Sequence, residues 1–462
     1  MSMCFYLMIL FMQLFKIELV ESLKKNSCDL GQFTFINLRR SITLLFNIKS
    51  IGGRMKKSLI YTALLSLFSL QASAKLIQHT EQIAEVQFNG SSYELGQHVA
   101  DVAGAQILDS IDRFNNMLGV MLPGLNVVSI SKSFESKDVF TKLEKSSPDA
   151  AAYIKGLAKG LNRTPELLLS VAMSDEAILE SQSNGGMGFL QADVDSSAPA
   201  RCTVMAKSDQ QGSAWGAANF DYMGINYTGL IVLHHTDTDG KTRVIQTWAG
   251  LIPYGGISKG GQMVLMNTLA SDGTAREKDK GEIISDHATP SFYLSWDAYN
   301  IEQPKQVIDM VKNHDGYTAF FSYIVADGNN EVVNIENGYK GAVRTSTGPW
   351  KAHANHSTYQ QETFVDESFA AHSLTRQAAA DKFMPSATGE MAEAQNFLGT
   401  KPLWKGRGEL MGTVTSTYMN WTPTETTMYI QTDKSGDGER TVVINNHFVV
   451  KDESESYADI SS

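Results

Sequence analysis

Cysteine is scarce in this chain of 462 residues, which contains only Cys4, Cys28 and Cys202. Beyond residue 74, Cys202 stands alone, so the larger part of the chain cannot form an internal disulfide. The ordinary interpretation of a solitary cysteine is a buried residue that behaves as a small hydrophobic side chain. A chemical role for Cys202 therefore depends on what surrounds it.

Long apolar runs are also missing beyond residue 74, where no stretch approaches the roughly 20 residues that span a bilayer. Residues 55–74, MKKSLIYTALLSLFSLQASA, combine two lysines, an apolar stretch and a small-residue end. This pattern is typical of a secretory signal peptide, and it is too short and wrongly flanked for a stable membrane anchor. It predicts a periplasmic or secreted protein.

The predicted signal peptide begins at an internal methionine, Met55. We therefore expect residues 1–54 to be a mis-called start that is not native, and the exported chain to begin at Lys75. The alternative is a membrane segment at residues 3–15, although roughly 13 apolar residues are few for a span.

Over the whole chain, basic residues are outnumbered by acidic ones, with 39 Lys and Arg against 50 Asp and Glu. Residues 1–74 hold nine of the basic and three of the acidic residues, which leaves a formal charge of about −17 on the rest. Binding to phosphate backbones needs clustered cations, so we expect no nucleic-acid partner. The remaining length is enough to bury one large core or two.

Hydrophobic periodicity divides the chain from residue 75 into alternating blocks. A short strand and mostly helical patterns occupy residues 84–181, and an exposed loop is expected at 182–199. Strand patterns dominate 202–270, a helical pair follows at 290–314, and strands and one helix alternate to the end. The expectation is an α+β fold with two sheets covered by helices.

Cys202 lies between the predicted loop and the first predicted strand of the β-rich region. A chain cut before Cys202 would carry a thiol and a free α-amine on one residue. That amine has a reference pKa of about 7.7 to 8.0 and can accept the thiol proton near neutral pH. A nucleophile activated by its own N-terminal amine is an established arrangement.

Six short blocks occur in the order found in one family. The stretch Arg201-Cys202-Thr203, with Asn219-Phe220-Asp221 downstream, resembles the N-terminal-nucleophile hydrolases of the penicillin acyltransferase family, relatives of the choloylglycine hydrolases. The resemblance covers roughly residues 85–450. The other blocks that carry it are Gly90–Gln97, Tyr153–Gly160, Gly261–Asn267, His353–His356 and Ser373–Arg376.

This resemblance implies a four-layer αββα sandwich with a mostly helical N-terminal pro-segment. It also implies a precursor that cuts itself between Arg201 and Cys202 into an alpha subunit, residues 75–201, and a catalytic beta subunit, residues 202–462. The two subunits are expected to remain associated. The implied activity is cleavage of a non-peptide C–N amide bond in a small acyl amide, through an acyl-thioester and without cofactor or metal.

The resemblance further assigns a role to each matching residue. Cys202 would be the nucleophile, Asp221 would hold its α-amine, and Asn267 would donate to the oxyanion. Asn355 would bond near the amine or the oxyanion, and Arg376 would support the nucleophile's pocket. Taken singly, Asp221 could be a turn residue, Asn267 could simply end a strand, and a helical arginine is usually solvated.

One position departs from the pattern of the bile-salt relatives, which carry an arginine three residues before the aspartate. This chain has Ala218 there, so their substrate preference does not transfer. The acyl group and the amine stay open. Outside the cytoplasm activated acyl donors are scarce, so we expect hydrolysis rather than acyl transfer.

Three other interpretations were weighed against this one. Residues 256–260 match the G-x-S-x-G elbow of serine hydrolases, but a strand rather than a helix is expected after them. A metal site could use His234, His235 and nearby aspartates, with His353, His356 and His372 as further ligands. However, adjacent strand residues face opposite ways, and Asp237–Gly240 favours a hairpin turn. An inactive protein of the same fold that only binds an acylated ligand is the third.

Overall fold

The computed structural model describes residues 75–177, 202–269, 289–314, 317–318, 321–337, 343–358, 367–405, 411–432 and 442–448. All of them belong to one compact unit, Ala72–Ser462. The expected mis-called start (1–54), the signal peptide (55–74), the loop at 182–199 and Arg201 lie outside the described residues.

The N-terminal part of the described chain begins with two strands, β1 (Lys75–Gln78) and β2 (Ile83–Asn89), and is otherwise helical, as its periodicity predicts. Ser91 begins the long helix by a capping box with Glu94. Ser147 and Thr164 cap the two helices expected between 147 and 179, each followed by proline in the first turn. The helices are α4 (Ser92–Met121), α5 (Val127–Ser136), α6 (Val139–Ser146), α7 (Pro148–Leu161) and α8 (Pro165–Ala172).

The larger sheet has nine strands in the order β1-β2-β5-β6-β7-β8-β9-β10-β11. β2 pairs with β5 in parallel, and the other neighbours in this sheet are antiparallel. Its further strands are β5 (Leu230–Thr236), β6 (Thr242–Trp248), β7 (Ile252–Ile257), β8 (Met263–Thr268), β9 (Phe321–Ala326), β10 (Val332–Asn337) and β11 (Val343–Gly348).

The smaller sheet has six antiparallel strands in the order β12-β3-β4-β13-β14-β15. Two neighbouring strands of this sheet, β3 and β4, follow Cys202 directly in the chain. The strands are β12 (Trp350–His353), β3 (Thr203–Ser208), β4 (Ala214–Met223), β13 (Met411–Thr422), β14 (Glu425–Gln431) and β15 (Val442–His447).

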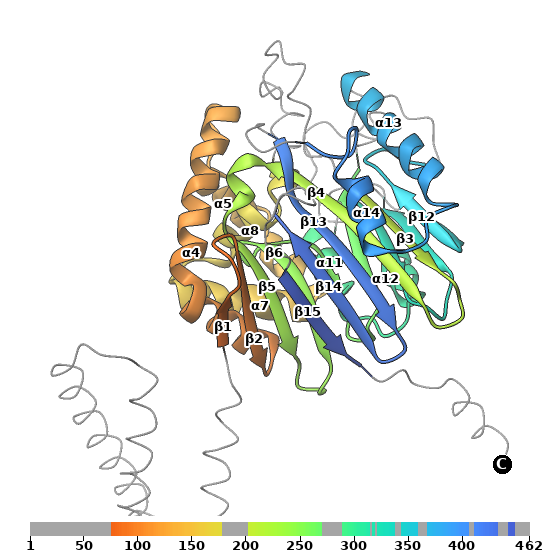
Figure 1. The fold of residues 1–462 in the computed structure, drawn as a ribbon. Coiled ribbons are helices and arrows are strands. Elements are labelled where there is room, and N and C mark those ends of the chain that lie inside the picture. The colour runs from red at the N-terminus through yellow and green to blue at the C-terminus, as the bar shows by residue number, and fades with distance from the viewer. Residues whose placement is uncertain are drawn as a thin grey trace, which may run out of the picture. The chain divides into compact units, whose positions relative to one another are not determined.

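Strand alternation divides the buried residues of the smaller sheet between two cores. In β3, Val204 and Ala206 join the large core shared with the nine-stranded sheet, whereas Met205 faces the other way. Met205 packs with residues of α13 (Glu367–Phe383) and α14 (Met391–Leu398). Figure 1 shows these two helices beside the six-stranded sheet, away from α4, α5 and α8.

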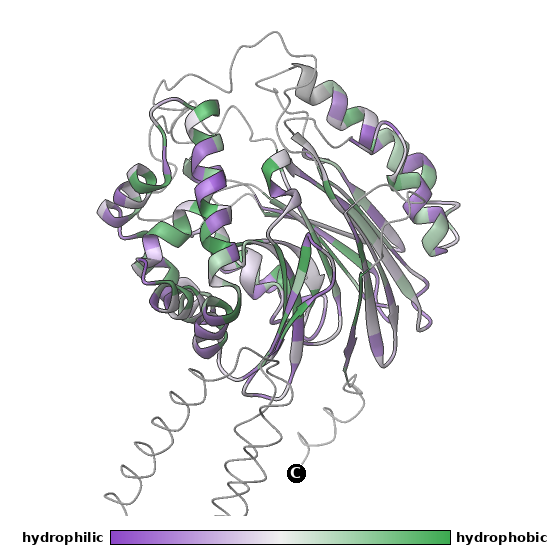
Figure 2. Cartoon of the chain, turned by 60° about the vertical axis from the view of Figure 1, so that its left-hand side comes forward, coloured by the Kyte–Doolittle hydropathy of each residue, from purple (hydrophilic) through white to green (hydrophobic). Residues whose placement is uncertain are grey.

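Helices on the other side cover the nine-stranded sheet: α4 contacts β2, and both α8 and α11 (Ser291–Asp297) contact β7. Figure 2 shows helices with separate apolar and polar faces, as expected where one side packs on a sheet. None of the helices in the described segments has the length and apolar content needed to cross a membrane. The α+β class predicted from the sequence is confirmed.

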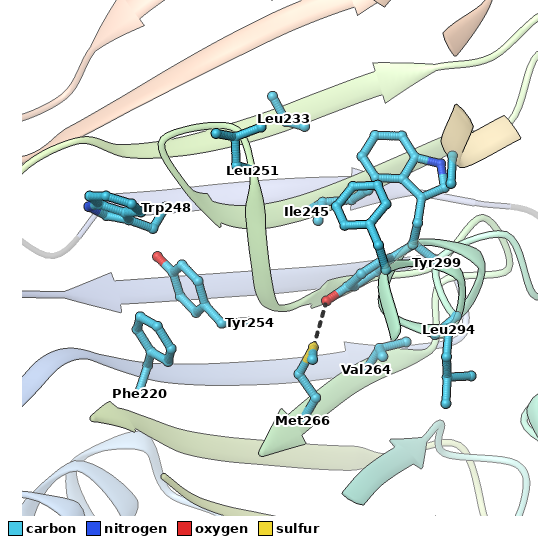
Figure 3. Close-up of a cluster of buried hydrophobic side chains, with 14 of the residues drawn as sticks. Phe220, Leu233, Ile245, Trp248, Leu251, Tyr254, Val264, Met266, Leu294 and Tyr299 are labelled. Atoms are coloured by element: carbon cyan, nitrogen blue, oxygen red, sulfur yellow. Dashed lines mark hydrogen bonds between the residues drawn. The ribbon is translucent and has the colours of Figure 1, made fainter. Parts of the chain in front are cut away.

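Aromatic contacts join the two sheets next to the predicted nucleophile. Phe220 of β4 stacks on Tyr254 of β7 with ring centroids 4.2 Å apart, and Figure 3 shows the pair close to Met266. Met266 in turn accepts a weak hydrogen bond from Tyr299 at 4.0 Å. These large buried side chains fix the separation of β4, β7 and β8 at one end of the core.

Several elements were not predicted. Strand β7 carries Pro253, Gly255 and Gly256, which lower strand propensity, and the sequence pattern missed it. The short edge strands β1, β11 and β12 and the helix α14 were also missed. The helical pair predicted at 290–314 is confirmed as α11 and α12 (Gln306–Lys312). The hairpin expected at Asp237–Gly240 is confirmed between β5 and β6.

Helices α4 and α7 cross at a contact that only glycine permits. A Cβ atom on Gly96 would lie 2.2 Å from the carbonyl oxygen of Tyr153, and one on Gly156 would lie 2.0 Å from that of Tyr93. Both obstacles are main-chain atoms in helices, so neither can move aside without separating the helices.

We therefore expect Gly156→Ala to lower the free energy of unfolding by about 1–3 kcal/mol or more, because it overpacks the crossing. Denaturant unfolding monitored by circular dichroism measures this loss. Gly119→Ala is the matched control, since Gly119 is exposed on α4 with no atom near its would-be Cβ. It should be neutral or stabilise by up to about 1 kcal/mol. Equal effects of the two substitutions would contradict a glycine-dependent crossing.

Candidate active site

Cys202 immediately precedes β3, and its side chain is only 5% exposed. The antiparallel register of β3 and β4 pairs Thr203 with Asn219, which brings Cys202 alongside the end of β4 where Asp221 lies. The Cys202 Sγ lies 3.9 Å from the main-chain oxygen of Asp221. Asp221 is fully buried in the strand, so the interpretation of this residue as a turn aspartate is wrong.

Arg376 reaches this corner from α13 and is also fully buried. One terminal nitrogen donates to the main-chain oxygen of Cys202 and, at 2.8 Å, to the Thr203 hydroxyl. The other donates to Asn355 Oδ1 at 2.7 Å, while Nε donates to His372 Nδ1 at 3.0 Å. The expectation of a solvated helical arginine is therefore wrong, and Arg376 links α13, β3 and the loop after β12.

The two predicted asparagines, Asn355 and Asn267, both hold the loop after β12 in place. Asn355 is fully buried, and its Nδ2 donates to the main-chain oxygen of Thr268 at 2.6 Å. Its main-chain N–H donates to the Ser373 hydroxyl at 2.9 Å. Asn267, near the end of β8, donates from Nδ2 to the main-chain oxygen of Ala354. The loop after β12 is thus tied to the end of β8 twice.

A histidine that the metal interpretation had considered supports the same loop. His353 is fully buried, and its Nε2 lies 2.7 Å from Glu336 Oε1. The hydrogen bond and the charge of His353 hold the pKa of Glu336 below its usual range, against the effect of burial. Ser357 and Thr358 donate to the same carboxylate, which therefore anchors both ends of the 353–358 segment to β10.

A small cavity of about 50 Å³ opens beside the Cys202 thiol. Asn267 lines it together with apolar side chains of both sheets, and α11 and the end of the N-terminal helical region close it. Asp175 and Glu176, which follow α8, also line it, and the sequence analysis missed both. The sequence feature that could have identified them is an acidic pair inside the apolar helical pattern of residues 165–179. The remaining lining residues include Phe220, Tyr222, Ile252, Tyr254, Met266 and Phe321.

Burial dominates the electrostatics of this corner. It raises the pKa of the Cys202 thiol to about 12, with a further upward contribution from the negative charge of Asp221 that outweighs the opposing charge of Arg376. Burial lowers the pKa of Arg376 to about 10, so the guanidinium stays charged at neutral pH. Burial also raises the pKa of Asp175, to about 7, and that of Glu176.

The residues of the alternative serine-hydrolase and metal sites are arranged in ways that do not fit those sites. Residues 256–260 end β7 and turn into β8, and Ser258 donates to Gln262, so no strand-to-helix elbow forms. His234 contacts Glu85 at 2.9 Å, whereas His235 contacts the main-chain oxygen of Gly90 at 2.7 Å. Within the described segments no group of three His, Cys, Asp or Glu side chains has the spacing of a metal site.

No model of a protein family matches the chain, and no curated protein matches it. Among solved structures, the chain is similar to penicillin V acylase from Agrobacterium tumefaciens at 9% sequence identity and a TM-score of 0.29. The match covers 53% of this chain and 85% of that one. At that score the likeness carries no argument, and the chain's own sheets and helices define its fold.

The raised pKa of Cys202 predicts an unreactive thiol in the intact chain. With a pKa of about 12, only about one thiol in 10,000 is ionised at pH 8, compared with about a quarter for an ordinary cysteine. Iodoacetamide should therefore alkylate Cys202 at least tenfold more slowly in the folded intact chain than in the same chain in urea. Mass spectrometry follows the reaction, and equal rates in the two states would contradict the buried, un-ionised thiol.

Arg376→Lys should destabilise the protein, because one ammonium group cannot serve acceptors on three elements. Each buried acceptor left unsatisfied costs about 1–3 kcal/mol, so thermal or denaturant unfolding should show a loss in that range or above it. Arg163→Lys, at an exposed arginine after α7, is the matched control and should change stability by less than about 0.5 kcal/mol.

Proposed function

We propose that this protein is an exported, self-processing amidohydrolase with Cys202 as an N-terminal nucleophile. The observation that carries the proposal is the convergence of four separate elements on one buried thiol. Cys202 and Asn267 line the same cavity, and Arg376 holds both the Cys202 main chain and Asn355. The order helices, sheet, sheet, helices supports the αββα sandwich of N-terminal-nucleophile hydrolases as the finer description of the fold.

Activation of Cys202 would need a cut between Arg201 and Cys202. In the intact chain the Cys202 nitrogen is an amide and cannot accept a proton, which accords with the raised thiol pKa. Cleavage replaces that amide by an α-amine, a base whose pKa lies near neutrality. The Asp221 carboxylate, on the neighbouring strand, would hold the new amine by a charge-assisted hydrogen bond.

The reaction then follows from these groups. The α-amine takes the thiol proton as the Cys202 sulfur attacks the substrate carbonyl, and Asn267 donates a hydrogen bond to the oxyanion. The C–N bond breaks, the departing nitrogen takes the proton from the α-ammonium, and an acyl-thioester remains on Cys202. A water molecule gives its proton to the amine, attacks the thioester and releases the acid and the thiol.

The two cleavage products would remain together as alpha and beta subunits. β2 belongs to the proposed alpha subunit and lies between β1 and β5, with seven registered positions from Ile83–Leu230 to Asn89–Thr236. The proposed reaction of Cys202 with a small acyl amide would need no metal or cofactor. Transfer of the acyl group to another amine would use the same thioester, but water is the abundant acceptor outside the cell interior.

Intact mass and N-terminal sequencing of the purified protein test the self-processing step. The expected result is two fragments, the larger beginning Cys-Thr-Val-Met. Cys202→Ala should leave a single uncut chain, because no thiol remains to attack the preceding carbonyl. A Cys202→Ala chain that still separates after Arg201 would refute self-cleavage, and a wild-type chain that stays intact would favour an inactive ligand-binding protein.

Asn267→Ala tests the oxyanion role in protein that has been cut correctly. Loss of one oxyanion donor typically lowers kcat by about 100- to 1000-fold. Release of p-nitroaniline from a series of N-acyl p-nitroanilides measures the effect, with the fraction of cut chain determined for each preparation. Asn116→Ala, at an exposed position of α4, is the matched control and should leave kcat unchanged.

A further inference from the structure

The cavity beside Cys202 contains two carboxyl groups that the proposed reaction does not use. Asp175 and Glu176 follow α8 and line the cavity together with the thiol. Asp175 is half-buried, whereas Glu176 is 0% exposed. Two acidic side chains therefore lie within one small cavity whose other walls are largely apolar.

Glu176 is held firmly by one oxygen only. Its Oε1 accepts hydrogen bonds from the hydroxyls of Ser291 and, at 2.7 Å, Thr318. Its Oε2 is buried and has no hydrogen-bond partner among the residues that the structure describes. The two hydroxyls thus fix the carboxyl group of a residue that lines the cavity, and one of its oxygens has no partner in the described part of the chain.

A second residue that lines the cavity, Asn267, also has a buried oxygen without a hydrogen-bond partner in the described part of the chain. Asn267 uses Nδ2 to bond Ala354, while its Oδ1 is buried and likewise lacks a partner in the described part of the chain. Asn267 Oδ1 is an acceptor, and Glu176 Oε2 is an acceptor whenever the carboxyl group is ionised. Buried acceptors without donors are costly, so a ligand that completes this cavity must bring N–H or O–H groups.

The carboxyl groups in the cavity favour a positively charged donor over a neutral one. The burial that raises the pKa of Asp175 and Glu176 does so because an unpaired negative charge is unfavourable there. A cation entering the cavity would relieve that cost, whereas a neutral alcohol would not. The apolar walls formed by Phe220, Tyr254 and Met266 suit the methylene groups that would carry the cation.

We propose that this cavity binds a primary ammonium group of the substrate, carried on a short aliphatic stem, with Glu176 Oε2 as its principal acceptor. The substrate class would then be amides whose acyl part bears an amine a few bonds from the scissile carbonyl. This inference about substrates rests on the proposed amidohydrolase function, but the binding of an ammonium ion does not. The small cavity, of about 50 Å³, suits a short stem.

Matched p-nitroanilides test the substrate preference. The 4-aminobutyryl amide carries a terminal ammonium group, and the pentanoyl amide has a methyl group in its place. Wild-type protein should show at least a tenfold higher kcat/KM for the ammonium substrate. Glu176→Gln keeps the shape and the bonds to Ser291 and Thr318, and it should lower that preference about 10- to 100-fold. Glu135→Gln, at an exposed position of α5, makes the same change of charge and should preserve it.

Calorimetric titration with n-butylammonium chloride separates this inference from the proposed function. Binding by wild type and by Glu135→Gln, but not by Glu176→Gln, supports the ammonium site even if neither anilide is hydrolysed. The inference is overturned if wild type fails to bind the cation, if n-pentanol binds as well, or if Glu176→Gln retains the substrate preference. Circular dichroism of each variant verifies that it is folded, and Asp175→Asn provides a second variant should Glu176→Gln not fold.

Discussion

The candidate site depends on one buried cation. Arg376 has no exposed surface, and its guanidinium donates to groups on β3, on the loop after β12 and within its own helix. A planar donor with fixed geometry can hold such acceptors in one arrangement, which a flexible ammonium cannot. The position of the Cys202 main chain, and through it the direction of its thiol, therefore follows from the position of α13 against the six-stranded sheet.

A buried charge of this kind requires compensation, and the neighbouring strands supply it. Asp221, fully buried at the end of β4, is the negative charge with the largest effect on Arg376. Burial and the negative charge of Asp221 both keep the thiol protonated in the intact chain, and they outweigh the opposing charge of Arg376. The intact chain thus holds an unreactive cysteine beside a buried carboxyl group and a buried guanidinium group.

The sequence predicted the α+β class, most strands and the long helices, because these depend on local periodicity and on caps such as Ser91, Ser147 and Thr164. It named Cys202, Asp221, Asn355 and Arg376 through short blocks, although their burial could not be predicted from those blocks. Arg376 and Asp221 each had an ordinary surface interpretation, and only the packing of α13 and β4 excludes it. Strand β7 was not predicted because its proline and glycines lower the strand propensity of the segment. Glu176 was missed because an acidic pair in a helical pattern gives no indication that Ser291 and Thr318, more than 100 residues away in the chain, will hold one of its members at a cavity.

The parallel pairing of β2 with β5 would have a further consequence if the chain were cut before Cys202. While the chain is continuous, β2 reaches β5 within a single polymer, and the search for its register is intramolecular. After cleavage the same pairing would have to form between two separate polypeptides, at a rate that falls with dilution. The cleaved form would then behave as a kinetically trapped assembly: durable while folded, but unable to regain its sheet from dilute, unfolded fragments.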